Sequence, residues 1–201
     1  FKVFIDSRKN VWVGTNKGLA LFHPEREEFT VFRHNKKDPN SLSDSDIQSL
    51  NEINSDMLWV GTSKGINILN LQQIVSLQAQ EIQFQHIAAN DLSSGLSDGS
   101  IWDIFQDTFG NIWIGTNRAI NFIGHNKSFF NAIAYSPIKG DDNALSDKTA
   151  SCVYYDNKEN LLWVGTETGG VDVYKGNEKI AHYSEEEHNL TGGQVVSAIV
   201  D

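Results

Sequence analysis

The sequence predicts an all-β protein made of four consecutive four-stranded antiparallel blades of a β-propeller. Three observations carry this prediction. A tryptophan-containing segment recurs four times in the 201 residues, turn-forming residues separate short apolar runs, and no segment shows a sustained helical period. Only residues 69–80 have room for one helical turn. Units of four short strands that repeat every 40 to 50 residues or so are typical of β-propellers.

The repeated segment reads W-V-G-T or W-I-G-T in every copy. Its tryptophans are spaced by 47, 54 and 50 residues, which gives a period of about 50. They are Trp12, Trp59, Trp113 and Trp163. A second marker, Leu-Ser-Asp, lies 17 or 18 residues before three of them. Its copies are Leu42-Ser43-Asp44, Leu96-Ser97-Asp98 and Leu145-Ser146-Asp147, and Leu190-Thr191-Gly192 opens a further copy.

Four strands are expected in each period, and the third copy shows them best. The run 101–106 is almost continuously apolar, which suits a first strand buried on both faces. Turns rich in Gly, Asn and Asp then separate the next two strands. These elements are a turn at 107–111, a strand at 112–116, a turn at 117–119 and a strand at 120–124. A more polar fourth strand is expected at positions such as 29–34 and 82–88.

The repeat also predicts the organisation of the whole chain. The blades are expected at about 1–46, 47–100, 101–149 and 150–194, with 195–201 as the first strand of a further blade. The opening F-K-V-F-I-D matches the last six residues, so that Asp6 corresponds to Asp201. Because an open array of blades exposes strand edges, we expect this segment to pair with neighbouring blades or with a second copy in a homodimer.

The recurring residues themselves have a structural interpretation. A tryptophan ring can fill the space between two blades, and the glycine after it lets the next blade approach. The aspartates that precede the tryptophans recur in register, which favours turn formation over catalysis. Three positions depart from the pattern: Ile53 replaces an aspartate, Ala119 replaces a glycine and Glu159 is an insertion. The turn at Ala119 is therefore expected to differ in shape.

Composition and motifs exclude several classes of function for this segment. The net charge of -10 and the pI near 5.0 argue against nucleic acid as a partner. Cys152 is the only cysteine, which rules out an intrachain disulfide and a multi-cysteine metal site. No run approaches 18 apolar residues, so no membrane insertion by this segment is expected. Its six histidines lack metal-site spacing, and no nucleophile elbow or phosphate loop is present. We therefore predict no catalytic residue, metal or cofactor here.

The pattern L-S-D-x-x-I followed by D-x-x-G-N-x-W-I-G-T is complete between Leu96 and Thr116. It resembles the two-component regulator propeller repeat of the extracytoplasmic sensor regions of Bacteroidetes hybrid histidine kinases. The resemblance implies a periplasmic sensor with two seven-bladed propellers and an immunoglobulin-like domain, joined to kinase and response-regulator modules across the inner membrane. Many such sensors respond to oligosaccharides derived from complex glycans and control the transcription of genes for their use.

Specificity is expected where the copies differ. At the start of the first strand the third copy has Trp102-Asp103, whereas the others have Gln48-Ser49, Ser151-Cys152 and Val196-Ser197. An aromatic ring beside a carboxylate suits a sugar platform. We therefore predict a ligand-binding site of Trp102, Asp103, Arg118 and Asp98. The alternative is that Trp102 packs against the central channel or the next blade.

The sequence thus favours a ligand-sensing propeller segment, outside the inner membrane, of a hybrid two-component sensor. Two other classes remain open at this point. One is a propeller enzyme of the streptogramin-lyase or glycosidase type, which has similar W-x-G-T repeats. The other is a scaffold that binds only protein partners.

Overall fold

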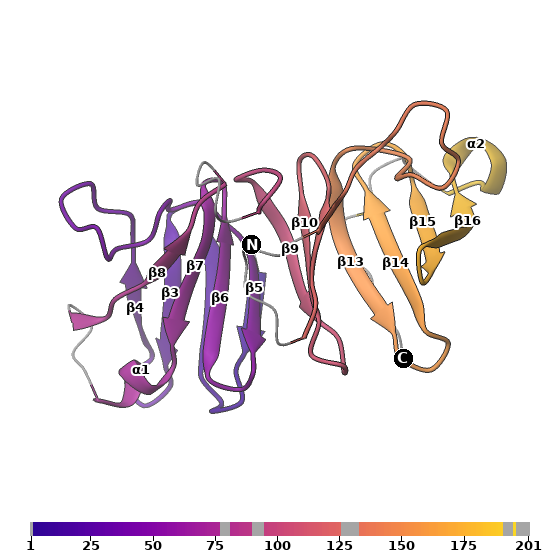
Figure 1. The fold of residues 1–201 in the computed structure, drawn as a ribbon. Coiled ribbons are helices and arrows are strands. Elements are labelled where there is room, and N and C mark those ends of the chain that lie inside the picture. Colours follow the sequence, from indigo (N-terminus) through magenta and orange to yellow (C-terminus); the bar gives the residue numbers. More distant parts are fainter. Residues whose placement is uncertain (1, 77–80, 90–94, 126–132, 191–194, 196–201) are drawn as a thin grey trace. The chain divides into compact units, whose positions relative to one another are not determined.

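The structure, a computed structural model, describes residues 2–76, 81–89, 95–125, 133–190 and 195. These residues form four four-stranded sheets, and in each sheet the strands follow one another in chain order (Figure 1). Every strand pair whose register is described is antiparallel. The predicted fold class, all-β with four four-stranded antiparallel blades, is confirmed.

Each sheet is one blade, numbered in chain order. Blade 1 comprises β1 (Lys2–Ile5), β2 (Val11–Thr15), β3 (Gly18–His23) and β4 (Glu28–Phe32). Blade 2 comprises β5 (Ile47–Ile53), β6 (Met57–Thr62), β7 (Gly65–Asn70) and β8 (Gln85–Ile87). Blade 3 comprises β9 (Ile101–Gln106), β10 (Ile112–Thr116), β11 (Ile120–Ile123) and β12 (Ile133–Tyr135). Blade 4 comprises β13 (Ala150–Asp156), β14 (Leu161–Thr166), β15 (Val171–Lys175) and β16 (Glu178–Tyr183).

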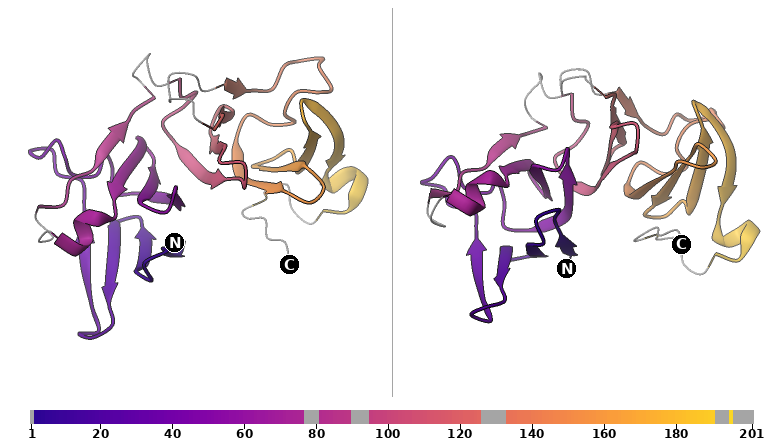
Figure 2. Two further views of the ribbon diagram at one scale, coloured as in Figure 1. Left: turned by 60° about the horizontal axis from the view of Figure 1, so that its bottom comes forward. Right: turned by 90° about the horizontal axis from the view of Figure 1, so that it is seen from below.

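Two short helices accompany the sheets. Helix α1 (Gln72–Ser76) lies in the connection between β7 and β8, within the segment expected to hold a helical turn, and α2 (Glu185–His188) follows β16 (Figure 2). None of the helices in the described ranges is long and apolar enough to cross a membrane. The expected first strand of a further blade, 195–201, lies outside the described residues except for Val195.

The chain divides into two compact units. Unit 1 comprises Phe1–Ala89 with Gly99–Ile101 and holds blades 1 and 2, and unit 2 comprises Asn90–Asp98 with Trp102–Asp201 and holds blades 3 and 4 except for the first residue of β9. Each unit has its own apolar core between its two blades. We call these cores the 1–2 wedge and the 3–4 wedge.

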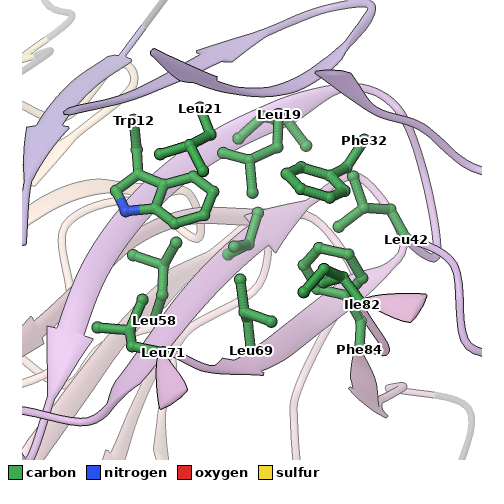
Figure 3. Packing of buried hydrophobic residues seen from close by; sticks show 12 residues of the cluster. Trp12, Leu19, Leu21, Phe32, Leu42, Leu58, Leu69, Leu71, Ile82 and Phe84 are labelled. Carbon is green, nitrogen blue, oxygen red and sulfur yellow. The ribbon is translucent and has the colours of Figure 1, made fainter. Parts of the chain in front are cut away.

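Buried side chains of blades 1 and 2 meet in the 1–2 wedge (Figure 3). Trp12 of blade 1 is completely buried, and its ring lies 6.3 Å from that of Phe32. The ring of Phe84, from blade 2, lies 5.8 Å from Phe32. Further buried side chains complete the core, among them Leu19, Leu42, Leu58, Leu69, Leu71 and Ile82. The tryptophan therefore fills the space between two blades, as predicted.

The 3–4 wedge has the same plan. Trp113 stacks on Tyr155 of blade 4 with ring centroids 6.3 Å apart, and it also contacts Phe122 of its own blade. The buried residues around it are Ile120, Leu145, Ala150, Val153, Leu162 and Val164.

In blades 1, 2 and 3, the glycine of the W-x-G-T segment receives the first residue of the next blade, and in blade 4 it lies against Val195. A Cβ at Gly14 would lie 2.7 Å from Cγ2 of Ile47, and one at Gly165 would lie 2.7 Å from Cγ1 of Val195. Gly61 and Gly115 meet Ile101 and Ala150 in the same way. Real Cβ atoms do not approach other atoms this closely, so only glycine fits, and the predicted close approach is confirmed.

The recurring aspartate is a turn-forming residue, as predicted. In blade 1 the buried carboxylate of Asp6 accepts hydrogen bonds from the backbone N–H groups of Arg8 and Asn10, both at 2.9 Å. It also accepts from Nδ2 of Asn10 at 2.8 Å and from Nε1 of Trp12 at 2.9 Å. Asp107 makes the same four contacts in blade 3, with Phe109, Asn111 and Trp113. The carboxylate thus ties the turn to the tryptophan.

The two departures at this turn have visible consequences. In blade 2, Ile53 is buried at the aspartate's position. In blade 4 the insertion of Glu159 moves Asp156 one residue further from Trp163, and the carboxylate accepts from the N–H groups of Lys158 and Glu159. Trp163 instead stacks on Tyr183, with ring centroids 6.1 Å apart.

Candidate functional site

The Leu-Ser-Asp marker and the turn after G-T lie together at one end of each of blades 2, 3 and 4, which we call the marker end. In blade 3, the N–H of Ser97 donates to Oδ1 of Asn121 at 2.9 Å, and the hydroxyl groups of Ser97 and Thr116 are 2.9 Å apart. Asn121 and Thr116 are fully buried. Strands β10 and β11 therefore fix the marker in place, which presents Asp98 beside the turn.

Asp98 and Arg118 form an ion pair across this marker end. Nε of Arg118 lies 3.4 Å from Oδ2 of Asp98, and the Arg118 side chain is 74% exposed. Exposed ion pairs of this kind are worth about 0–1 kcal/mol. Arg118 is therefore available to a ligand at little cost.

The turn that carries Arg118 differs from its counterparts, as predicted for Ala119. Thr116 Oγ1 donates to the carbonyl oxygen of Ala119 at 2.9 Å, a contact that the other blades share, and it also accepts from the N–H of Ala119 at 3.1 Å. Gly18 and Gly65, at the same position in blades 1 and 2, have φ of 130° and 121°, a conformation that favours glycine, whereas Ala119 has no positive φ. The turn therefore has a different backbone conformation in blade 3, although β10 and β11 pair in the same register as β2 and β3.

Trp102 joins the same turn. Its Nε1 donates to Oδ1 of Asn117 at 2.6 Å, so the half-buried indole is held by the residue next to Arg118. Asp103 lies elsewhere: its Oδ2 accepts from the N–H of Val153 at 2.9 Å. Its carboxylate therefore links blade 3 to blade 4. Of the four predicted residues, the structure brings Trp102, Arg118 and Asp98 to one turn, and directs Asp103 toward the neighbouring blade.

A shallow basin of about 430 Å³ lies beside Arg118. It is bordered by Ser97, Arg118, Ala119, Ala134, Ser136, Pro137 and Lys148. Lys148 follows the marker of blade 4 and adds a second cation. Sequence comparison among the copies did not single it out, because only the fold brings the marker of blade 4 beside the turn of blade 3.

A second hollow, which we call the cavity, opens in the 3–4 wedge. It has a volume of about 240 Å³ and shares Ala134 and Ser136 with the basin. Tyr174 lines it, and the Tyr174 hydroxyl oxygen is buried without a hydrogen-bond partner among the described residues. Burial raises the pKa of this hydroxyl far above its usual range, and the carboxylates of Asp172 and Asp141 raise it further. The sequence alone could have pointed to Tyr174, because blade 2 has a leucine, Leu69, at the matching position.

Behind the cavity, blade 4 carries a buried carboxylate where blades 2 and 3 have asparagine. Asp172 is fully buried, and it occupies the position in blade 4 that Asn67 occupies in blade 2 and Asn121 in blade 3. It accepts from the N–H and the hydroxyl of Ser146 at 2.8 and 2.9 Å. His182 Nδ1 at 2.9 Å and Lys179 Nζ at 3.5 Å complete the cluster.

This cluster does not resemble a metal centre. In the ranges that the structure describes, no group of three or more His, Cys, Asp or Glu side chains is placed to hold a metal ion. The hydrogen bonds and Lys179 compensate the buried charge of Asp172, which is the usual requirement for a buried carboxylate.

Comparison with known families agrees with the marker. Residues 95–118 match the two component regulator propeller. The matched residues run from just before the Leu-Ser-Asp marker to Arg118, and so contain the aspartate turn, Trp113 and the turn after G-T. A comparison with curated protein sequences finds no match.

Solved structures share the fold. The extracellular domain of the putative hybrid two component system BT4673 from B. thetaiotaomicron is 20% identical, with a TM-score of 0.66 over 91% of this chain and 24% of that one. PorZ, a bacterial surface component of the type-IX secretion system of Porphyromonas gingivalis, is 17% identical, with a TM-score of 0.67 over 98% of this chain and 29% of that one. The extracellular domain of the putative hybrid two component system BT3049 from B. thetaiotaomicron is 32% identical over 100% of this chain and 23% of that one, with a TM-score of 0.44.

The chain spans about a quarter of the length of these proteins. At identities of 17% and 20%, the likeness to BT4673 and PorZ shows the fold alone. The resemblance read from the marker and the W-I-G-T segment is confirmed by the family match. Residues 95–118 are a two-component regulator propeller repeat, set within four consecutive blades of propeller fold.

Proposed function

We propose that this chain is a ligand-sensing segment in the periplasmic region of a hybrid two-component sensor. The observation that carries the proposal is the two-component regulator propeller repeat at residues 95–118. The similar B. thetaiotaomicron structures are extracellular domains of putative hybrid systems, which supports a place outside the inner membrane. In this proposal the segment acts by binding, and phosphotransfer and transcriptional control belong to other parts of the parent protein.

The marker end of blade 3 is the proposed ligand site, and the ligand is an oligosaccharide derived from a glycan. Trp102 offers the side of an indole that Asn117 holds in place. Arg118 and Lys148 border the basin and carry hydrogen-bond donors for sugar hydroxyl groups. Aromatic rings with a few fixed polar groups are the usual composition of a ligand site. Asp103 then contributes indirectly, by holding blade 4 against blade 3.

A binding screen tests this proposal. The chain is screened by thermal shift against a library of neutral and acidic oligosaccharides, and hits are measured by isothermal titration calorimetry. Trp102→Ala and Arg118→Ala should each weaken a hit about tenfold, since one lost contact of this kind is worth about 1.4 kcal/mol. Lys64→Ala is the matched control, because Lys64 pairs with Asp44 at the marker end of blade 2. Unchanged affinity in a folded Trp102→Ala variant would show that the site is elsewhere.

The screen also separates the other classes of function. A chain that binds no oligosaccharide but retains a protein partner would be a scaffold. Release of a cleaved sugar during the titration would indicate a propeller enzyme.

A further inference from the structure

The 3–4 wedge lacks side chains that fill the same place in the 1–2 wedge. In blade 1, Phe32 pairs with Leu19 across β3 and β4 and is 9% exposed. The matching residue of blade 3 is Tyr135, which pairs with Ile120 and is 37% exposed. The outer part of the 3–4 wedge is therefore less well covered than that of the 1–2 wedge.

The connection between the third and fourth strands explains the rest of the difference. In blade 2 this connection is long, and it places the buried side chains of Ile82 and Phe84 in the wedge. In blade 4 it is only the turn Gly176-Asn177. A two-residue turn has no side chain that can reach the wedge as Phe84 does.

Lys179 stands where Phe84 would be. The N–H of Phe84 donates to the carbonyl oxygen of Asn40, and the N–H of Lys179 donates to Oδ1 of Asn143. Asn40 and Asn143 each lie two residues before the marker leucine. The Lys179 side chain is largely buried and is directed to the carboxylate of Asp172.

The result is the cavity of about 240 Å³, in which apolar walls lie beside the polar residues Ser136, Asp141, Asn143 and Asn177. Trp113, Ile120 and Leu145 form the buried walls, and Tyr135 and Tyr174 add two phenol rings. An apolar cavity of about 150 Å³ already accommodates benzene. The space left between the blades is therefore large enough for one substituted ring.

The Tyr174 hydroxyl, which we call the polar point, is the polar group of the cavity that is buried without a hydrogen-bond partner among the described residues. Buried hydroxyl groups almost always have a hydrogen-bond partner, and this one has none among the described residues. Since its pKa is raised, it stays protonated at neutral pH and can donate. The carboxylates of Asp141 and Asp172 that contribute to this shift also disfavour an anion in the cavity.

We propose that the cavity of the 3–4 wedge binds an uncharged, ring-shaped small molecule, whose hydrogen-bond acceptor receives the Tyr174 hydroxyl proton. The ring takes the place that Phe32 and Phe84 fill in the 1–2 wedge, against Trp113. This site is distinct from the oligosaccharide site at the marker end, although the two hollows share Ala134 and Ser136.

Three small probes test the chemistry of the site. Acetophenone has a flat ring and a carbonyl acceptor, ethylbenzene has nearly the same shape without an acceptor, and benzoate is the anion. Calorimetric titration of the full chain should show one site for acetophenone, about tenfold weaker binding of ethylbenzene, and no binding of benzoate. Equal binding of all three would overturn the proposal, as would failure of the wild-type chain to bind acetophenone, for instance because its own side chains fill the space.

Two variants locate the site. Tyr174→Phe should reduce acetophenone affinity to that of ethylbenzene and leave ethylbenzene unchanged, and Tyr183→Phe, a tyrosine outside the cavity, is the matched control. Ala144→Phe fills the cavity and should abolish binding of both probes. If Ala144→Phe does not fold, the Tyr174→Phe variant still tests the proposal through the ratio of its affinities for acetophenone and ethylbenzene. An unchanged ratio in that variant would refute the role of the hydroxyl.

Discussion

The 1–2 wedge and the 3–4 wedge are both apolar cores between two consecutive blades, but they are packed differently. Both start from a tryptophan on the second strand, a marker leucine and a glycine that receives the next blade. They differ farther out, where Phe32 and Phe84 close one wedge and Tyr135 with Tyr174 leaves the other open. The comparison teaches that the repeated residues specify how blades join, while the variable connections decide whether the joint is filled.

The largest expected effect is the loss of a tryptophan from the filled wedge. Trp12 is fully buried and its Nε1 donates to Asp6, so Trp12→Ala should destabilise unit 1 by about 3–5 kcal/mol. Trp113→Ala should cost unit 2 less, because Trp113 already borders a cavity. Urea unfolding followed by circular dichroism measures both, with one transition expected for each unit. Equal losses would contradict the contrast between the wedges.

Opening the filled wedge sharpens the same comparison. Phe84→Ala removes the ring that lies 5.8 Å from Phe32 and should cost about 3 kcal/mol or more. It should also create a second cavity in the chain. Calorimetry with ethylbenzene would then report two sites per chain instead of one. A variant that is destabilised but still binds a single probe molecule would show that the 1–2 wedge collapses around the missing ring.

A smaller effect is expected at the polar point of the open wedge. Tyr174→Phe removes a buried hydroxyl that lacks a partner and should stabilise unit 2 by about 1 kcal/mol, because the desolvation penalty of that group disappears. Tyr155→Phe provides the control, since Tyr155 stacks on Trp113 in the same wedge. Thermal unfolding without ligand measures the change. A clear loss of stability would mean that the hydroxyl has a partner in solution.

The smallest effect concerns acid. At the marker ends, burial opposes the charge of Asp44 and Asp147, but hydrogen bonds from Lys64 and Thr168 outweigh it and lower the pKa of each carboxyl below 3.8. A carboxyl with a lowered folded-state pKa stabilises the fold above the unfolded value and loses this contribution as pH falls through the folded value. The free energy of unfolding should therefore decrease slightly below pH 3.8. In the Asp147→Asn variant this decrease should be smaller. Unfolding midpoints measured between pH 2 and 6 check this prediction, and a gain of stability at low pH would contradict it.

Much of the fold could be predicted because each period repeats the same local chemistry. The tryptophan, the turn aspartate and the glycine occur in register, so their structural roles follow from the pattern alone. The fourth strand was less predictable: 82–88 was expected to be extended, but β8 begins at Gln85. The reason is that Ile82 and Phe84 turn into the wedge, where the N–H of Phe84 bonds to Asn40.

The candidate site was predicted only in part. Differences between the copies led to Trp102 and Arg118, which the structure places at one turn. They also led to Asp103, whose direction depends on a side-chain rotamer and on the N–H of Val153 from another blade. The cavity depends on the length of the connection in blade 4 and on an absence of filling side chains. A pattern of conserved spacing carries no information about space that is left empty.

The glycine of each W-x-G-T segment also bears on the order of assembly. It belongs to one blade but accommodates the first residue of the next, as Gly14 does for Ile47 and Gly115 does for Ala150. A folded blade thus presents a preformed contact surface for the segment that is synthesised after it. The blades can therefore fold in the order in which they are synthesised, each one packing against the blade before it.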